Sequence, residues 1–251
     1  MIETNGRYSA RVIRVISYNL LKGRAFGEVE ALTRGDDAAD ALCLQEANVD
    51  TLPERIGELV LVDATRRNRL GLALYLRPER FTVGRTAAYE LKKSLHDHLF
   101  DPGPERLVGA MLHDLEAGRD LVLASFHAAP LTATNSLRRA QIKAAHGLLG
   151  ELGGGAPVIM VGDYNYPLFH GRLAKRMSRT GFDLILSDKR TYSAYKIFRG
   201  HFDFVTSQGM EIERVETLTR GRSDHLPIAI TADYRDVPAT GEQAIIEQAA
   251  S

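Results

Sequence analysis

The sequence predicts an α/β fold in which two mostly antiparallel β-sheets pack face to face with helices outside. Short apolar runs typical of strands are many, segments typical of helices are few, and most connections have hairpin length. Short connections join antiparallel neighbours, whereas parallel strands need long crossovers. The 251 residues contain no linker-like break and are enough for one large domain with a sizeable core. We expect an N-terminal tail at 1–10, one domain at 11–235 and a C-terminal tail at 236–251.

The first half of the chain carries mostly strand signals. Alternating β-branched and basic residues predict a strand over Arg11–Tyr18. Thr51–Leu59 is typical of a capped helix, because Thr is followed by Pro53 and Glu54. The other strands are expected at Ala41–Leu44, Leu70–Leu76, Phe81–Tyr89, Leu107–Leu115 and Leu121–Phe126, the last two as a hairpin joined through Ala117-Gly118-Arg119.

The second half contains the clearest helix, Thr134–Leu152, which begins at a capping Thr and ends at three glycines. A buried strand, Val158–Val161, follows and ends at Gly162. Leu168–Thr180 is expected to form a basic amphipathic helix that stops at Gly181. The last strands are expected at Phe202–Thr206, Ile212–Leu218 and Leu226–Ala232.

Composition limits the function classes. Lys plus Arg equals Asp plus Glu, 32 each, which argues against a large sequence-independent affinity for nucleic acid. Cys43 is the single cysteine, so the chain forms no internal disulfide, and its apolar neighbours indicate a buried, inert thiol. The N-terminus has no apolar signal region, and no run is long enough to span a membrane. We therefore expect a cytoplasmic monomer without a membrane span.

Polar residues that border or lie within apolar strands are the main functional signal. Asp163 and Asn165 follow the central strand two residues apart, so their side chains project to the same side. The full set is Asn19, Glu46, His127, Asp163, Asn165, Asp203, Asp224 and His225. Simpler interpretations exist for single members: Asp163 and Asn165 suit a turn, Asp203 a loop cap, and His127 a satisfied edge histidine.

The charges in this set predict a metal ion if the strand ends gather on one rim of the sandwich. Carboxylates brought together repel one another unless a divalent cation offsets their charge. Oxygen-rich ligands without a cysteine cluster favour Mg²⁺ or Mn²⁺ over Zn²⁺. Phosphodiester cleavage needs such a cation, an aligned water and help for the leaving oxygen, and an imidazole of His127 or His225 titrates near neutral pH.

Six motifs in order make the chain resemble the endonuclease/exonuclease/phosphatase superfamily, which has a four-layered α/β sandwich. The resemblance runs from about Val12 to Ile230. The motifs are Ser17-Tyr18-Asn19, Leu44-Gln45-Glu46, Ser125-Phe126-His127, Gly162-Asp163-Tyr164-Asn165, His201-Phe202-Asp203-Phe204-Val205 and Ser223-Asp224-His225-Leu226-Pro227.

The resemblance implies a role for each residue. Glu46 corresponds to the main metal carboxylate, supported by Asn19 and Asp224. Asp163 and Asn165 correspond to the pair that orients the attacking water or binds a second metal. His225, paired with Asp203, contacts the phosphoryl oxygen or serves as base. His127 binds phosphate or protonates the leaving oxygen. The number of metals and the identity of the base stay open.

The implied activity is Mg²⁺- or Mn²⁺-dependent hydrolysis of phosphoesters, with a nuclease-like phosphodiesterase as the main hypothesis. Its substrate would be a phosphodiester, in a nucleic acid or a nucleotide. The alternatives are a phosphatase or phosphodiesterase for a small molecule or phospholipid head group, and a non-catalytic binding module. Abasic-site repair is disfavoured, because the chain has no Trp and Thr191–Lys196 occupies the region of the family's Trp-bearing stretch.

Several further residues allow two interpretations. Arg138 and Gln141 share a helix face, and the pair either positions site loops or is solvated. The basic clusters are Arg66–Arg69 and Arg172, Lys175, Arg176 and Arg179; a solvated face is the simpler interpretation, and a polyanion track the alternative. The remaining candidates are a metal at His96-Asp97-His98, substrate contacts of Lys92 and Lys93, and base stacking or sheet packing of Tyr192 and Tyr195.

Overall fold

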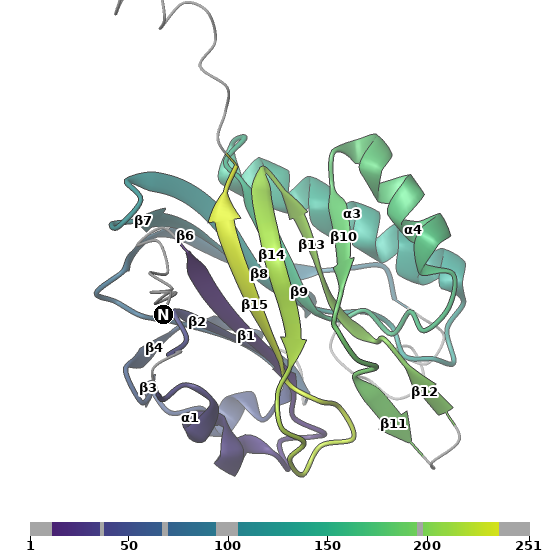
Figure 1. Cartoon of the computed structure of the whole chain (residues 1–251), viewed down its shortest axis with the longest axis horizontal. Coiled ribbons are helices and arrows are strands. Elements are labelled where there is room, and N and C mark those ends of the chain that lie inside the picture. The colour runs from purple at the N-terminus through teal and green to yellow at the C-terminus, as the bar shows by residue number, and fades with distance from the viewer. Residues whose placement is uncertain (1–11, 36–37, 67–69, 94–104, 195–197, 236–251) are drawn as a thin grey trace, which may run out of the picture.

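The computed structural model describes residues 12–35, 38–66, 70–93, 105–194 and 198–235. In these residues two β-sheets pack face to face, and the long helices cover the outer side of one of them (Figure 1). The first sheet has the order β14 (Met210–Thr217), β15 (Ile228–Tyr234), β1 (Ile13–Asn19), β2 (Ala41–Ala47), β5 (Gly71–Leu76), β4 (Leu59–Ala64) and β3 (Arg55–Ile56). The predicted sandwich is confirmed.

The second sheet has the order β10 (Asp183–Leu186), β13 (Asp203–Gln208), β9 (Val158–Asp163), β8 (Arg119–His127), β7 (Glu105–Asp114) and β6 (Phe81–Glu90). The described helices are α1 (Val29–Leu32), α3 (Asn135–Gly153) and α4 (His170–Met177), with 3₁₀ turns at Phe26–Glu28, Val49–Thr51 and Ser178–Thr180. A small ribbon of β11 (Tyr192–Ala194) and β12 (Phe198–Gly200) completes the fold. None of the described helices is both long and apolar enough to cross a membrane.

Three apolar layers hold the sandwich together. One lies between the sheets, a second between the second sheet and α3 and α4, and a third on the outer side of the first sheet. Strand β9 shows why its sequence is apolar without alternation: Ile159 and Val161 face the other sheet, while Val158 and Met160 face the helices. A strand buried on both faces has no polar side.

Helix α3 matches its prediction closely. The Thr134 hydroxyl accepts a hydrogen bond from the Leu137 amide at 3.3 Å, which caps the first turn. The helix ends at Gly154, whose φ of 58° is the left-handed conformation that glycine adopts without a Cβ penalty. Helix α4 and the 3₁₀ turn after it match the predicted basic helix, which ends at Gly181.

The helix predicted over Thr51–Leu59 is wrong. The backbone is extended at Leu52. Strands β3 and β4 then form a tight hairpin around Gly57, whose φ is 59°. Pairing lets Ile56 and Leu59 bury their side chains in the apolar layer on the outer side of the first sheet, and this burial outweighs the local helix signal. The strand β4 and the short edge strand β10 had no counterpart in the prediction. The predicted tails at 1–10 and 236–251 lie outside the described residues and stay predictions.

Candidate active site

The ends of strands from both sheets bring the predicted polar residues to one rim. β8 and β9 run parallel with His127 opposite Asp163, and β13 runs antiparallel to β9 with Asp203 opposite the same Asp163. Asn19 ends β1 in the other sheet, and its amide nitrogen donates to the Asp163 Oδ2 at 3.0 Å across the sandwich. Three segments distant in sequence therefore meet at Asp163.

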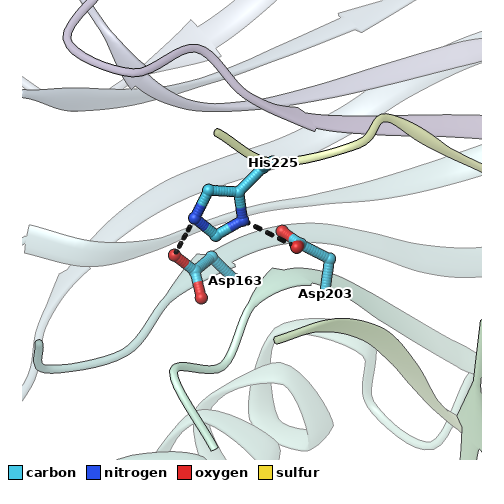
Figure 2. A group of neighbouring side chains, drawn as sticks. All are labelled: Asp163, Asp203 and His225. Atoms are coloured by element: carbon cyan, nitrogen blue, oxygen red, sulfur yellow. Dashed lines mark hydrogen bonds and ion pairs between the residues drawn. The ribbon is translucent and has the colours of Figure 1, made fainter. Parts of the chain in front are cut away.

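His225 sits between two carboxylates (Figure 2). Its Nδ1 lies 2.7 Å from Oδ2 of Asp203, and its Nε2 lies 3.7 Å from Oδ2 of Asp163. All three side chains are buried. Burial alone would lower the pKa of His225, but the charges of Asp203 and Asp163 outweigh it and raise the pKa to about 10. The imidazole is therefore a cation at neutral pH, with Nε2 directed at Asp163.

For Asp163, burial is the effect that dominates the pKa. Burial raises its pKa most, and the charges of Asp203 and Glu46 also raise it, whereas His225 and the Asn165 amide lower it; the net result is a pKa of about 7. A carboxyl group with a pKa near neutrality is suited to exchanging a proton with a water molecule.

Glu46 reaches the rim through a local irregularity of β2. The pairing of β2 with β5 shifts register between Leu44 and Ala47, and Glu46 has a φ of 53°, which is rare for a non-glycine residue. Its Oε2 accepts from the Lys22 amide at 2.9 Å, and its Oε1 lies 3.4 Å from the Asn19 amide nitrogen. Backbone strain of this kind concentrates at functional sites.

His127 and Asn165 complete the surroundings of Asp163. The His127 Nε2 lies 3.6 Å from the Asp163 Oδ2. The Asn165 amide donates to the Asp163 Oδ1 at 2.8 Å, and Asn165 adopts a φ of 48°. Its side-chain nitrogen lies 3.4 Å from the Ala128 carbonyl. Asp163 and Asn165 thus form a short turn, in which the Asp163 carboxylate accepts from the Asn165 amide and the Asn165 side chain contacts the segment after β8.

Asp224 lies on the same rim. The Ser223 hydroxyl donates to the Asn19 carbonyl at 2.7 Å, and Asn19 also contacts Glu46 by its side chain, so the segments carrying Glu46 and Asp224 meet at Asn19. The Asp224 carbonyl accepts from the Ser193 amide at 3.1 Å, and its charge helps to raise the pKa of His225.

The donor set suits a hard divalent cation. Among the described residues, Asp163, Asp203 and His225 form a group of acids and histidine with all ligand atoms within 4.8 Å of one another. This group differs from the ligands expected from sequence, which are Asn19, Glu46 and Asp224. The Nδ1 of His225 is engaged by Asp203, which leaves mainly carboxylate oxygens for a metal. Such oxygens are the ligands that Mg²⁺ and Mn²⁺ prefer.

A buried polar triangle beneath the site was not anticipated. The Gln45 Nε2 donates to Ser17 at 3.2 Å and to Ser125 at 3.0 Å, and the Ser125 hydroxyl donates to the Leu44 carbonyl at 3.0 Å. These contacts join the two sheets two residues before Asn19 and His127 and one residue before Glu46. The sequence offered one signal for it: Ser17, Gln45 and Ser125 are polar residues that each lie within one of the six motifs, next to apolar strand residues.

Further contacts support the Asp203 backbone and the His225 ring. The Thr191 hydroxyl accepts from the amides of Phe202 and Asp203, both at 3.1 Å. The Tyr192 ring packs against the His225 ring with centroids 4.8 Å apart. Base stacking and sheet packing were the two roles considered for Tyr192, and its contact with His225 is a packing contact.

Arg138 and Gln141 position loops beside the site and are buried rather than solvated. The Gln141 Oε1 accepts from the Ala129 amide at 2.9 Å, and its Nε2 donates to the Lys92 carbonyl at 2.7 Å. Arg138 donates to the Pro130 carbonyl at 2.7 Å. The loop that follows His127 is thereby attached to α3.

The other sequence candidates contribute less to the site. Lys92 and Lys93 have exposed side chains. Arg66 is exposed and lies near Asp63. The remaining candidates, Arg67–Arg69, His96-Asp97-His98 and Tyr195, lie outside the described residues.

Comparison with known proteins agrees with this geometry. The family model described as "Endonuclease/Exonuclease/phosphatase family" matches residues 16–225. A search of curated proteins gave no match. An endonuclease/exonuclease/phosphatase family protein from Bacteroides thetaiotaomicron superposes with a TM-score of 0.71 at 16% identity, covering 89% of this chain and 98% of that one.

Two other similar structures have more specific descriptions. A mannosyl-6-phosphatase of Bacteroides thetaiotaomicron VPI-5482 has a TM-score of 0.69 at 16% identity, with 88% of this chain and 100% of that chain covered. TDP2 of D. rerio, in complex with a single-strand DNA product, has a TM-score of 0.68 at 16% identity, with 88% and 99% covered. At these identities the structures support the shared fold.

The family match extends over most of the chain and includes every predicted site residue. The family takes its name from enzymes that hydrolyse phosphoester bonds, so a phosphoester hydrolase is supported at this level. The resemblance inferred from the six motifs is confirmed: the chain belongs to the endonuclease/exonuclease/phosphatase family.

Proposed function

We propose that the protein is a divalent-metal-dependent phosphodiesterase of the nuclease type. One observation supports this most: a single oxygen, Oδ2 of Asp163, faces Asn19 Nδ2 at 3.0 Å, His127 Nε2 at 3.6 Å and His225 Nε2 at 3.7 Å. An amide and two imidazoles directed at one buried carboxylate form a site for a water and a phosphoryl oxygen. The complex of D. rerio TDP2 with a single-strand DNA product supports a nucleic-acid substrate.

Glu46, Asn19 and Asp224 would hold the cation, which we propose is Mg²⁺ or Mn²⁺. When bound, it supplies positive charge that neutralises the non-bridging phosphoryl oxygens. Glu46 is partly exposed, which suits a cation that keeps some of its waters.

The chain's own residues would align the nucleophile and move the proton. Asp163, held by the Asn165 amide, accepts a proton from the attacking water, which its near-neutral pKa permits. Asp203 holds the His225 imidazolium so that its Nε2 proton can be donated to a phosphoryl oxygen. His127 lies on the other side of Asp163 and donates a proton to the leaving oxygen.

A substrate panel tests the proposal. Purified protein with Mg²⁺ or Mn²⁺ should cleave at least one of single-stranded DNA, double-stranded DNA, RNA and bis-p-nitrophenyl phosphate. Glu46→Gln and His225→Ala should each lower kcat by on the order of 10²- to 10⁴-fold. His113→Ala is the control, because His113 is exposed and pairs with Asp120 at the far end of β7. A near-wild-type rate in either site variant refutes the roles given above.

The same experiment separates the alternatives. Turnover confined to phosphate monoesters or inositol phosphates would favour a phosphatase acting on a small molecule or phospholipid head group. Metal binding by calorimetry without turnover on any substrate would favour a non-catalytic binding module.

A further inference from the structure

Helices α3 and α4 both lie on the outer side of the second sheet (Figure 1). A groove with positively charged walls lies between them and continues over α4. It consists of three adjoining hollows of about 280, 500 and 380 Å³ that all include Arg176. Residues of both helices line the first two, whereas the third is lined only by α4 and the 3₁₀ turn that follows it. Six cations line this α3–α4 groove: Arg139, Lys143, Arg172, Lys175, Arg176 and Arg179. No acidic side chain is among the described residues that line it.

The concentration of charge is local, since the whole chain has a formal net charge of zero. Within the described part of the chain, no carboxylate forms an ion pair with any of the six cations. Lys175 and Arg176 stand in the last turn of α4, where they also favour the helix dipole. Arg139 and Lys143 lie on α3 far from its C-terminus, so the helix dipole does not account for them.

An exposed aromatic ring stands at one end of the groove. Phe169 is 58% exposed and its backbone φ is 65°, a conformation that costs a bulky residue free energy. The Arg172 guanidinium carbon lies 5.5 Å from the ring centroid. A strained backbone that keeps a Phe in solvent beside cations points to a ligand with flat rings and negative charge.

The same end of the groove is connected to the active site through the segment after β9. Tyr166 lines the groove beside Phe169 and follows the site residue Asn165 by one position. The Arg139 Nη1 donates to the Tyr166 hydroxyl at 3.2 Å, which ties the groove wall to the loop after β9. A chain lying in the groove would therefore lead to the rim that carries Asp163.

We infer that the α3–α4 groove binds a single-stranded nucleic acid whose scissile phosphate lies at the active site. The six cations follow its phosphates and Phe169 stacks on one base, which is how grooves hold single strands without reading sequence. A membrane fits less well, because the cations line a concave channel that a flat lipid surface does not enter. The inference rests on the proposed function for the position of the cleaved bond, but binding is separable from cleavage.

Fluorescence anisotropy with a labelled 15-nucleotide oligo-dT, in EDTA to prevent turnover, measures the binding alone. The double variant Lys175→Gln/Arg176→Gln should weaken binding roughly 25-fold at 0.1 M salt and reduce the slope of log K against log salt by about 1.4, because two phosphate contacts are lost. The matched control is Arg34→Gln/Arg55→Gln, which removes two exposed cations near α1 and β3 and should leave the affinity and slope unchanged. Equal affinity of wild type and the groove variant overturns the inference.

Phe169→Gly separates a loss of contact from a loss of folding. Glycine relieves the positive φ, so the variant should be at least as stable as wild type, while its affinity for oligo-dT falls on the order of tenfold. Unchanged affinity in a stable Phe169→Gly protein contradicts the stacking role.

Failure of the inference and failure of the proposed function have different signatures. Oligo-dT binding that the groove variant weakens, with no cleavage of any substrate of the panel in Mg²⁺ or Mn²⁺, supports the groove and refutes the phosphodiesterase. Cleavage of bis-p-nitrophenyl phosphate with unaltered oligo-dT binding in the groove variant supports the phosphodiesterase and refutes the groove. If the variant loses binding to vesicles with phosphatidylinositol phosphates while wild type does not bind oligo-dT, the groove is a membrane site and the inference is wrong.

Discussion

Gly162 shows how one residue supports the site from below. Its φ is 148°, and a Cβ at this position would lie 2.0 Å from the carbonyl oxygen of Phe126 on the neighbouring strand. The parallel pairing that sets His127 opposite Asp163 also sets Phe126 opposite Gly162. The absence of a side chain at Gly162 therefore permits the close approach that aligns two site residues.

We predict that Gly162→Ala lowers the free energy of unfolding by about 3 kcal/mol or more, because Phe126 backbone must move to admit the methyl group. Urea denaturation measures the change. Gly147→Ala is the matched control: Gly147 is exposed within α3 with open space around its Cα, so alanine should stabilise by roughly 0.5–1 kcal/mol. Similar values for the two substitutions would contradict this account.

His146 makes stability depend on pH. Its ring stacks on Phe182 with centroids 3.6 Å apart, and its Nε2 bonds to the Thr206 hydroxyl at 3.0 Å. Burial lowers the pKa of His146 to about 3, whereas the unfolded chain has the ordinary value of about 6.5. Because the folded pKa is depressed for a base, stability is highest above pH 6.5 and falls as the unfolded state takes up a proton.

The prediction is that this residue alone costs roughly 2 kcal/mol of stability between pH 7 and pH 5. His146→Gln, which keeps a hydrogen-bonding side chain without a titrating group, should show a smaller loss over the same range. Urea unfolding of both proteins at each pH isolates the difference. An identical pH dependence in the two proteins would show that the His146 ring is protonated in the fold.

At the scale of the element, helix α3 is attached to the loops beside the site by hydrogen bonds from its side chains to the loop backbone. Helix α3 has a long exposed face, yet Arg138 and Gln141 are buried and bond to the loops that flank the rim. Helical periodicity located this helix and its ends, but it placed Arg138 and Gln141 on a surface of unknown exposure. Their burial depends on the loop after β8, which folds back over the first turns of α3.

We predict that Gln141→Ala lowers the unfolding free energy by about 2–4 kcal/mol, because the Ala129 amide and the Lys92 carbonyl both lose a buried partner. Ala144→Gln on the exposed face of the same helix should change stability by less than about 0.5 kcal/mol. Thermal and urea unfolding provide both values. A Gln141→Ala protein as stable as wild type would mean that water replaces both hydrogen bonds.

At the scale of the whole molecule, a buried charge cluster joins the two sheets at the end away from the site. Arg80 donates to Asp114 at 3.1 Å and to Asp40 at 2.9 Å, and the Tyr234 hydroxyl donates to Asp114 at 3.3 Å. Asp114 ends β7, whereas Leu107 near the other end of β7 pairs beside His127. The site and this cluster therefore close opposite ends of one sandwich.

We predict that Arg80→Met lowers the free energy of unfolding by about 3–5 kcal/mol, since it leaves Asp114 charged, buried and without its cation. Adding Asp114→Asn should restore part of the loss. Arg34→Met is the control, because the Arg34–Glu30 pair is exposed and should contribute less than about 1 kcal/mol. The rate per folded molecule should remain that of wild type in Arg80→Met; a large fall in kcat would show that the two ends are coupled.

The sequence by itself determined most of the long strands, the two main helices and the polar residues that end or flank the strands. Periodicity and caps are local properties, so α3, with Thr134 before it and Gly154 after it, could be read from a few neighbouring residues. The motifs around Asn19, Glu46, His127, Asp163, Asp203 and His225 likewise identified the family before any contact was known.

Tertiary structure alone decided which of these residues meet. The 3.0 Å contact from Asn19 to Asp163 spans two sheets and 144 positions of sequence, and contacts of the Gln45 triangle and the Arg80 cluster span 80 and 40 positions. It also replaced the helix predicted at Thr51–Leu59 by a hairpin, because burying Ile56 and Leu59 against the first sheet outweighs local preference. Contacts between distant segments depend on register and burial, which no short stretch of sequence contains.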